Sequence, residues 1–182
     1  MKTRIIILSF VSLFVMTCSA SKTNATPEQI AALDQLVANQ TFKIESHWAM
    51  PQVNRSISAL QNSGIIAPGS NANRISLTGI ANELKLDGET ISSRLPYYGE
   101  VQMPSGYNGS DDNNISFDGT IKNYKAEKND NSSYTISFDA KSNNEGYNVT
   151  IILYPSLKSD MILKGAKRFP IRYTGQITPI SE

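Results

Sequence analysis

Apolar residues, with a few small ones among them, recur at every second position through most of the chain after residue 40, the spacing of β-strands with one buried face. Short alternating runs of this kind, separated by turn residues, predict a mainly β fold. Because the connections are short, we expect an antiparallel meander forming a sandwich or open barrel of about 7–9 strands. The clearest runs are Phe42, Ile44, Ser46 and Trp48; Ile115, Phe117, Gly119 and Ile121; Tyr134, Ile136 and Phe138; Tyr147, Val149, Ile151 and Leu153; and Phe169, Ile171, Tyr173 and Gly175.

A different spacing, that of an amphipathic helix, precedes these strands. Thr26 and Gln29 are spaced as in a capping box, and Pro27 suits the first helical position. We therefore predict one short N-terminal helix packed on the sheet, within a single β-rich domain over residues 26–182. The apolar stripe of this helix consists of Ile30, Leu33, Leu36 and Val37.

Glycine, proline and asparagine mark the turns between the predicted strands. Asp87 and Gly88 predict a hairpin, and Gly79 predicts a bulge in the strand before it. Residues 51–73 predict a loop with one helical turn, and residues 97–114 predict a long loop.

The first residues have the layout of a signal peptide. Lys2 and Arg4 give a positive start, an apolar stretch occupies residues 5–16, and small residues follow. The stretch is shorter than the ~20 residues that a membrane-spanning helix needs. We predict a signal peptide over residues 1–17, a tether over residues 18–25 and an exported β domain.

Cys18 is the only cysteine of the chain, so no disulfide can form within it. Val15-Met16-Thr17-Cys18 resembles the lipobox of bacterial lipoproteins, in which the cysteine thiol is acylated. We predict lipidation of Cys18 and attachment to a membrane through that lipid anchor. The alternative is ordinary cleavage after Ala20, which would give a soluble periplasmic or secreted protein.

Charge and residue types argue against several classes of function. Lys and Arg number 17 against 16 Asp and Glu, and loss of Lys2 and Arg4 with the leader leaves 15 against 16, so we expect no nucleic-acid partner. His47 is the only histidine, which excludes sites with several histidine ligands. No serine lies in the sequence context of a nucleophile elbow. We predict no catalytic residues, no metal and no cofactor.

Carboxylate chemistry stays open as an alternative. Two Asp or Glu residues in one cleft can cleave glycosidic bonds, which would make the protein a hydrolase of envelope glycans. Some of the candidates lie among glycine, serine and asparagine, a composition that also keeps an ordinary loop soluble. The candidates are Glu45, Asp87, Asp111, Asp112 and Asp118.

Aromatic residues supply the candidate ligand-binding positions. Tyr97 and Tyr98 are adjacent, and because neighbours in an extended chain point to opposite sides, one ring should be partly exposed. An apolar pocket between the strands would favour a lipocalin-like carrier of a small apolar ligand, whereas a filled core would favour a module that binds a glycan or a protein. The predicted ligand-binding residues are Trp48, Tyr97, Tyr98 and Tyr107.

Four segments are distinctive: Phe42-Lys43-Ile44-Glu45-Ser46 with Trp48, Leu95-Pro96-Tyr97-Tyr98-Gly99, Ile115-Ser116-Phe117, and Ile171-Arg172-Tyr173-Thr174-Gly175. Together they resemble a domain-of-unknown-function family of Bacteroides-type envelope lipoproteins. The resemblance implies export and a β fold, and it assigns no functional residues. Because no acidic run follows Cys18, it also implies a position at the outer membrane facing the periplasm. We expect a non-enzymatic binding module of the cell envelope.

Overall fold

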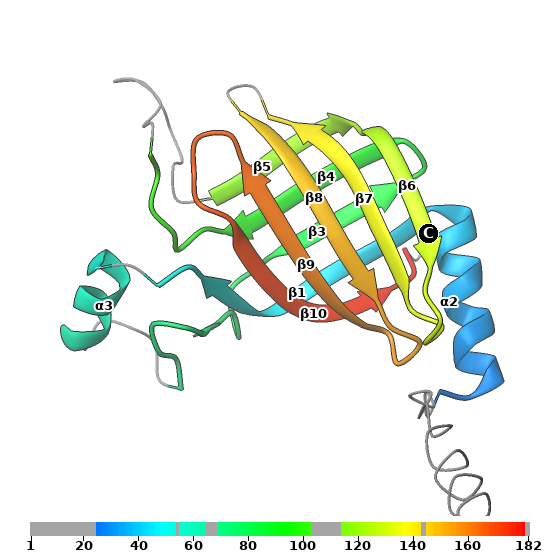
Figure 1. The fold of residues 1–182 in the computed structure, drawn as a ribbon, viewed down its shortest axis with the longest axis horizontal. Coiled ribbons are helices and arrows are strands. Elements are labelled where there is room, and N and C mark those ends of the chain that lie inside the picture. The colour runs from blue at the N-terminus through cyan, green and yellow to red at the C-terminus, as the bar shows by residue number, and fades with distance from the viewer. Residues whose placement is uncertain (1–24, 54, 65–68, 103–113, 143–144, 181–182) are drawn as a thin grey trace, which may run out of the picture.

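The computed structural model describes residues 25–53, 55–64, 69–102, 114–142 and 145–180 (Figure 1). Cys18, Tyr107, Asp111 and Asp112 lie outside the described residues, as does the predicted signal peptide. The described helices are α2 (Pro27–Asn39) and α3 (Arg55–Asn62). The described strands are β1 (Thr41–Pro51), β2 (Ile75–Ser76), β3 (Glu83–Asp87), β4 (Thr90–Pro96), β5 (Asn114–Thr120), β6 (Lys122–Lys128), β7 (Tyr134–Lys141), β8 (Gly146–Leu153), β9 (Lys158–Gly165) and β10 (Ile171–Thr178).

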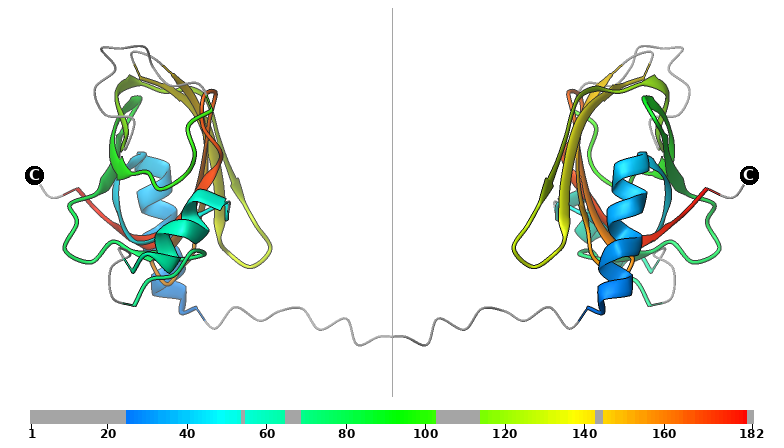
Figure 2. Two further views of the ribbon diagram at one scale, coloured as in Figure 1. Left: turned by 90° about the vertical axis from the view of Figure 1, so that its left-hand side faces the viewer. Right: turned by 90° about the vertical axis from the view of Figure 1, so that its right-hand side faces the viewer.

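The strands form one antiparallel sheet that curls into a nearly closed, barrel-like shape (Figures 1 and 2). The order along the sheet is β5-β4-β3-β1-β10-β9-β8-β7-β6, with β2 paired to β1 beside this path. The order ends at β5 and β6, which only Ile121 separates in the chain, so the sheet is open between these two strands. The predicted mainly β, antiparallel fold is confirmed.

Most neighbours in the sheet are consecutive in the chain, as in a meander, but two pairs are not: β3 pairs with β1, with the short β2 between them in the chain, and β1 pairs with β10. The first long strand, β1, pairs with the last, β10, from Lys43 opposite Thr178 to Pro51 opposite Ile171. This pairing of the two ends of the domain brings its two meanders, β3 to β5 and β6 to β10, into one sheet. It also places β1 and β10 side by side at the centre of the strand order.

Helix α2 lies across one end of the barrel-like sheet (Figure 2). The backbone N–H of Gln29 donates to Thr26 Oγ1 (3.4 Å) and that of Thr26 donates to Gln29 Oε1 (3.0 Å), which is the predicted capping box. Leu33 and Val37 are buried against the core. The predicted helix and its packing are confirmed. Among the described helices, none is long and apolar enough to cross a membrane.

The turns agree with the sequence in part. Asp87 pairs with Thr90, so Gly88 and Glu89 form the two-residue loop of the predicted hairpin, and Gly88 has the positive φ (60°) that this turn needs. The predicted bulge at Gly79 is wrong: this residue, at φ 80°, lies in a turn between β2 and β3. Residues 51–73 contain a helix of 8 residues, α3, rather than one turn.

Buried apolar side chains from all parts of the sheet meet in one core. The largest fully buried side chains are those of Tyr173, Phe42 and Phe138, which come from β10, β1 and β7. Protein interiors of this kind are packed about as densely as organic crystals. The space that the sheet encloses is therefore a packed core built from, among others, Leu33, Ile44, Leu84, Leu86, Ile91, Leu95, Ile115, Ile136, Val149, Ile151, Leu153, Met161, Leu163 and Ile171.

Candidate functional site

A bulge in β1 changes the face to which its side chains point. Ser46 pairs with Gly175 and Trp48 pairs with Thr174, so His47 is the extra residue of the longer strand. Ser46 and Ala49 are buried, whereas His47 is exposed and Trp48 is partly exposed. His47 and Trp48 therefore lie together on the outer face of the sheet. The predicted alternation, with Trp48 on the same face as Phe42, is wrong beyond Ser46.

Two residues far along the chain hold this bulge. The pairing of β1 with β3 ends at Ile44, and its pairing with β2 begins at Trp48, which leaves the backbone of Ser46 between them. The side chain of Asn82 accepts a hydrogen bond from Ser46 N (2.8 Å) and donates one to Ser46 O (3.0 Å). On the other side, β1 approaches Gly175 so closely that a Cβ there would overlap a backbone oxygen of β1.

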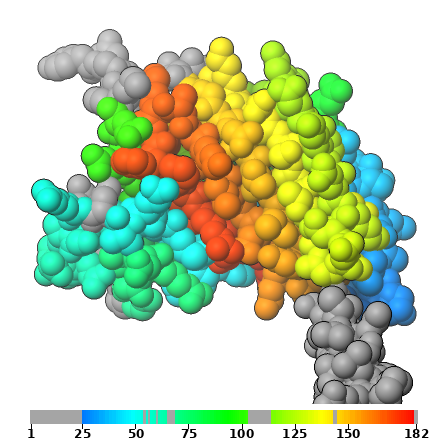
Figure 3. Space-filling model, viewed as in Figure 1, coloured from blue at the N-terminus to red at the C-terminus, as the bar shows by residue number. Residues whose placement is uncertain are grey.

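The outer face of β1, β10 and β9, with the chain just after β8, is hollowed into a groove of about 470 Å³, which we call the outer groove. Figure 3 shows this side of the molecule, with β10 and β9 running diagonally across it. The register places Trp48, Thr174 and Asp160 in one row across the sheet and Gln176 beside Lys158 in the next. The side chains that line the groove include those of His47, Trp48, Tyr154, Lys158, Asp160 and Gln176.

Trp48, Asp160 and Tyr154 of the outer groove are held by neighbouring side chains. The guanidinium of Arg74 lies 3.6 Å from the centroid of the Trp48 ring, a cation–π contact. Asp160 accepts from Arg172 Nη2 (2.8 Å) and from the hydroxyl of Tyr154 (3.1 Å). Burial raises the pKa of Tyr154, and its bond to the Asp160 carboxylate raises it further. At neutral pH the groove thus presents a neutral phenol, a paired carboxylate and a fixed indole.

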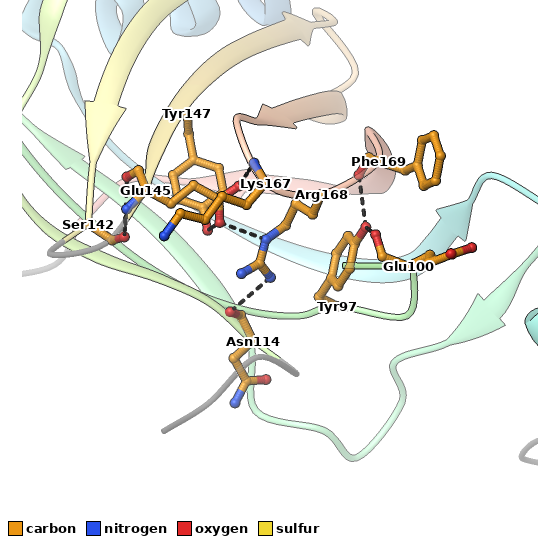
Figure 4. A network of polar contacts seen from close by, with 9 residues as sticks. All are labelled: Tyr97, Glu100, Asn114, Ser142, Glu145, Tyr147, Lys167, Arg168 and Phe169. Carbon is orange, nitrogen blue, oxygen red and sulfur yellow. Dashed lines mark hydrogen bonds and ion pairs between the residues drawn. The ribbon is translucent and has the colours of Figure 1, made fainter. Parts of the chain in front are cut away.

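A second polar cluster, the barrel-end network, lies where the chain enters β8 and β10 (Figure 4). Its centre is an ion pair between Arg168 Nε and Glu145 Oε2 at 2.9 Å, with side chains only 7% and 3% exposed. Glu145 also accepts from the hydroxyl of Tyr147 (2.9 Å) and from the N–H of Lys167 (2.7 Å). Arg168 Nη1 donates to the carbonyl of Asn114 (3.4 Å). The carboxylate is thus bonded by three donors, and the network joins β8 to the chain between β9 and β10.

Tyr97 belongs to this network. The Arg168 guanidinium lies 4.8 Å from its ring centroid, and its hydroxyl donates to the carbonyls of Glu100 and Phe169, both at 3.0 Å. Burial raises the pKa of Tyr97 to about 12, although the nearby Arg168 lowers it in part. Tyr98 is half-buried and packs against the core. Tyr97 is buried and Tyr98 is partly exposed, so one of the two adjacent rings is partly exposed, as expected.

The predicted ligand-binding residues therefore do not form one site. Trp48 lines the outer groove, whereas Tyr97 and Tyr98 pack at the barrel end, and Tyr107 lies outside the described residues. Sequence reasoning missed Tyr154, Lys158, Asp160 and Gln176, and it also missed the Glu145–Arg168 pair. An outward position on a strand is an ordinary place for a polar residue, so only the pairing of the strands could reveal these groups.

The candidate carboxylates are also apart. Glu45 is on β1, Asp87 ends β3 and Asp118 is on β5, and all three are exposed. Three strand spacings separate β1 from β5, which puts Glu45 and Asp118 about 14 Å apart along the sheet. Glycosidase pairs are about 5–10 Å apart. Among the described residues, no group of three or more His, Cys, Asp and Glu side chains is placed to hold a metal ion.

The fold defines the class of protein: a small antiparallel, nearly closed barrel-like sheet capped by an N-terminal helix. A family model described as a domain of unknown function, DUF4251, matches residues 24–177, and the chain belongs to this family. The resemblance to a domain-of-unknown-function family is thus confirmed. No curated protein matches the chain.

A solved structure supports the fold. The crystal structure of a DUF4251 family protein from Bacteroides eggerthii DSM 20697 is similar with a TM-score of 0.57 and 12% sequence identity. The match covers 84% of this chain and 88% of that chain. At this identity the similarity shows a shared fold, and it assigns no role to any residue of the outer groove.

Proposed function

We propose that this chain is a lipid-anchored, non-enzymatic binding module of the bacterial cell envelope, and that the outer groove is its ligand site. The proposal is based on the difference between the interior of the sheet and its outer face. The space inside the sheet is packed with apolar side chains, whereas the outer groove gathers an indole, an imidazole, a phenol and charged side chains in one hollow. Concave surfaces with a few convergent polar groups are the usual places for ligands.

A ligand inside the sheet is the weaker alternative. To enter, a small apolar molecule would have to displace fully buried side chains such as Phe42, Phe138 and Tyr173. Emptying such positions costs about 3–5 kcal/mol for each large aromatic side chain. A lipocalin-like carrier therefore has less support than a module that binds on its outer surface.

A binding role is also favoured over the alternative of a glycan hydrolase. The described candidates Glu45, Asp87 and Asp118 lie on different strands at the surface, and no observation draws two of them into one cleft. The acid in the outer groove, Asp160, already bonds to Arg172 and Tyr154. Such a carboxylate is held as a fixed acceptor for a ligand rather than as a proton donor.

The proposed lipid anchor is inferred from the predicted signal peptide and from Cys18 at its end. Acylation of Cys18 would tie the domain to a membrane through a tether that ends just before Thr26, the N-cap of α2. We expect the protein to face the periplasm from the outer membrane. Incorporation of labelled palmitate should occur in the wild type and in Ser19→Ala, a control that keeps the thiol, and should be lost in Cys18→Ala. Unchanged labelling of Cys18→Ala would remove the anchor from the proposal.

The site is tested separately, by ligand-dependent melting. A ligand present at 100 times its Kd stabilises the folded state by about 2.7 kcal/mol. Fatty acids, oligosaccharides and short peptides should be screened against the wild type and Trp48→Ala. We expect at least one class to raise the Tm of the wild type and to leave that of Trp48→Ala unchanged. An equal rise in both proteins would place the site elsewhere.

A further inference from the structure

We infer that the ligand of the outer groove is a short oligosaccharide, whose ring faces contact Trp48 and Tyr154 and whose hydroxyls bond to the polar side chains between them. This inference rests on the proposed function, since it names the ligand class of the same site. It is drawn from the spacing of the two aromatic rings, the chemistry of the floor, and the pairing of the strands beneath it.

The two aromatic residues stand on opposite sides of the groove. Trp48 is on β1, and Tyr154 follows β8 directly, with β10 and β9 between them. Three strand spacings of about 4.8 Å put the two positions about 14 Å apart along the sheet. Aromatic rings offer flat apolar faces with a polar tip, which match the C–H faces of sugar rings. A span of this length suits a chain of linked sugar rings better than a single one.

The floor between the rings is polar and mixed in its hydrogen bonding. Lys158 can donate, Asp160 can accept, and Gln176 can do both. A sugar hydroxyl is likewise both donor and acceptor, so such a floor can satisfy several hydroxyls at once. An acyl chain would desolvate these groups without replacing their hydrogen bonds, which costs free energy for each group buried. The floor therefore selects against a lipid.

The strands beneath the groove also select against an extended peptide. Peptides that bind to a sheet commonly add a strand to a free edge, where main-chain hydrogen bonds supply the affinity. Here β1, β10, β9 and β8 pair with one another in succession, so their backbone groups are already bonded. Apart from Gly175, the residues that line the groove have side chains that can contact a sugar.

The aromatic rings are held before any ligand arrives. Arg74 stacks 3.6 Å from the Trp48 ring centroid, and Asn82 fixes the bulge that turns Trp48 outward. On the far side, the hydroxyl of Tyr154 donates to Asp160, which Arg172 also holds. Groups fixed in this way lose little conformational entropy on binding, which favours affinity.

The chain supplies its own probe, because Trp48 is its only tryptophan. Trp48 fluorescence should be followed while neutral, N-acetylated and uronic-acid oligosaccharides, from di- to hexasaccharides, are added to the full protein. Palmitate and an alanine tetrapeptide serve as ligands of the other classes. We expect a saturable change in the emission with at least one oligosaccharide and none with palmitate or the peptide.

Variants then place the binding in the groove. Tyr154→Ala and Lys158→Ala should each weaken the oligosaccharide by about tenfold, which corresponds to about 1.4 kcal/mol. Lys164→Ala, an exposed lysine of the same strand outside the groove lining, is the matched control and should bind as the wild type does. Tyr154→Phe keeps the ring, so it should keep most of the affinity. Circular dichroism establishes that each variant is folded.

The outcomes separate the two proposals. If palmitate or the peptide changes the emission and no oligosaccharide does, the sugar inference fails while the groove remains a ligand site. Equal oligosaccharide affinity in the wild type, Tyr154→Ala and Lys158→Ala would overturn the inference as well. If no ligand of any class changes Trp48 emission, and ligands that raise the Tm act equally on Trp48→Ala, the outer groove is not the site and both proposals fall.

Discussion

The ion pair between Glu145 and Arg168 gives the sharpest prediction about stability. Both side chains are more than nine-tenths buried, and their nearest atoms are 2.9 Å apart. Arg168→Met keeps a long apolar side chain and removes the charge, which leaves the Glu145 carboxylate buried without its cation. Breaking a buried pair by removing one partner costs about 3–5 kcal/mol. For a protein of this size each kcal/mol lowers Tm by about 2–4 °C, so we expect a drop of about 6–20 °C.

A second substitution tests the cause of that loss. Tyr147 and the N–H of Lys167 bond to different oxygens of Glu145. Glu145→Gln keeps one oxygen, which can accept from the N–H of Lys167, and its NH2 group can donate to the Tyr147 hydroxyl, while the negative charge is removed. Added to Arg168→Met, it leaves no unpaired charge in the network. We therefore expect the double variant to melt at a higher temperature than Arg168→Met alone, a non-additivity that a double-mutant cycle measures directly.

The matched control is Arg172→Met, the same substitution in a surface pair. Arg172 is 50% exposed and bonds to Asp160, and exposed pairs contribute about 0–1 kcal/mol. The comparison requires the wild type and four variants: Arg168→Met, Glu145→Gln, the double variant and Arg172→Met. Thermal melting measured by circular dichroism and urea unfolding would give the stability of each. If Arg168→Met melts no lower than Arg172→Met, or if Glu145→Gln lowers the Tm of Arg168→Met further, the reasoning from burial is refuted.

Three further substitutions or conditions test other parts of the structure. Gly175→Ala places a Cβ against the backbone of β1 and should cost about 3 kcal/mol in urea unfolding, whereas Gly146→Ala, where a Cβ meets nothing within 4 Å, should change stability little. Asn82→Ala removes the bonds to the backbone of Ser46 and should cost about 1–3 kcal/mol and shift the emission of the single tryptophan; an unchanged spectrum would contradict its role in the bulge. The pKa of Tyr97 is raised to about 12, so above pH ~10 the unfolded chain loses this proton before the native state does. Tyr97 alone should therefore lower the stability by about 2–3 kcal/mol from pH ~10 to ~12, Tyr147 and Tyr173 should add to the fall because burial raises their pKa as well, and Tyr97→Phe should lessen the slope of the unfolding free energy against pH.

Local signals in the sequence were sufficient for much of the fold. The cap at Thr26, the apolar stripe of α2 and the Asp87-Gly88 hairpin each depend on residues within a few positions of one another, and the structure confirms all three. The pairing of β1 with β10 depends instead on residues at least 120 positions apart, such as Lys43 and Thr178. Nothing in the local pattern specifies such a partner, so the sequence alone left a sandwich and an open barrel equally possible.

The candidate site was predictable only in fragments, for the same reason. Trp48 stood out as the single tryptophan, but its outward position depends on Asn82 and Gly175, which are far away in the chain. Tyr97 stood out between proline and glycine residues, yet what surrounds it is the buried Glu145–Arg168 pair. A charged residue in a turn gives no sign in the sequence that it will be buried, because burial depends on which loops meet.

The position of the outer groove separates the proposed ligand site from the residues that stabilise the fold. The folding free energy comes mainly from the inward side chains of the sheet, and alternation along each strand leaves the outward ones free of that task. Lys158 and Gln176 are outward and exposed, so they can change without opening a cavity in the core. The exception is Gly175, which lines the groove between Thr174 and Gln176 and permits the close approach of β1 to β10. The outward side chains of the proposed ligand site can therefore change while Gly175 preserves the bulge beside the groove.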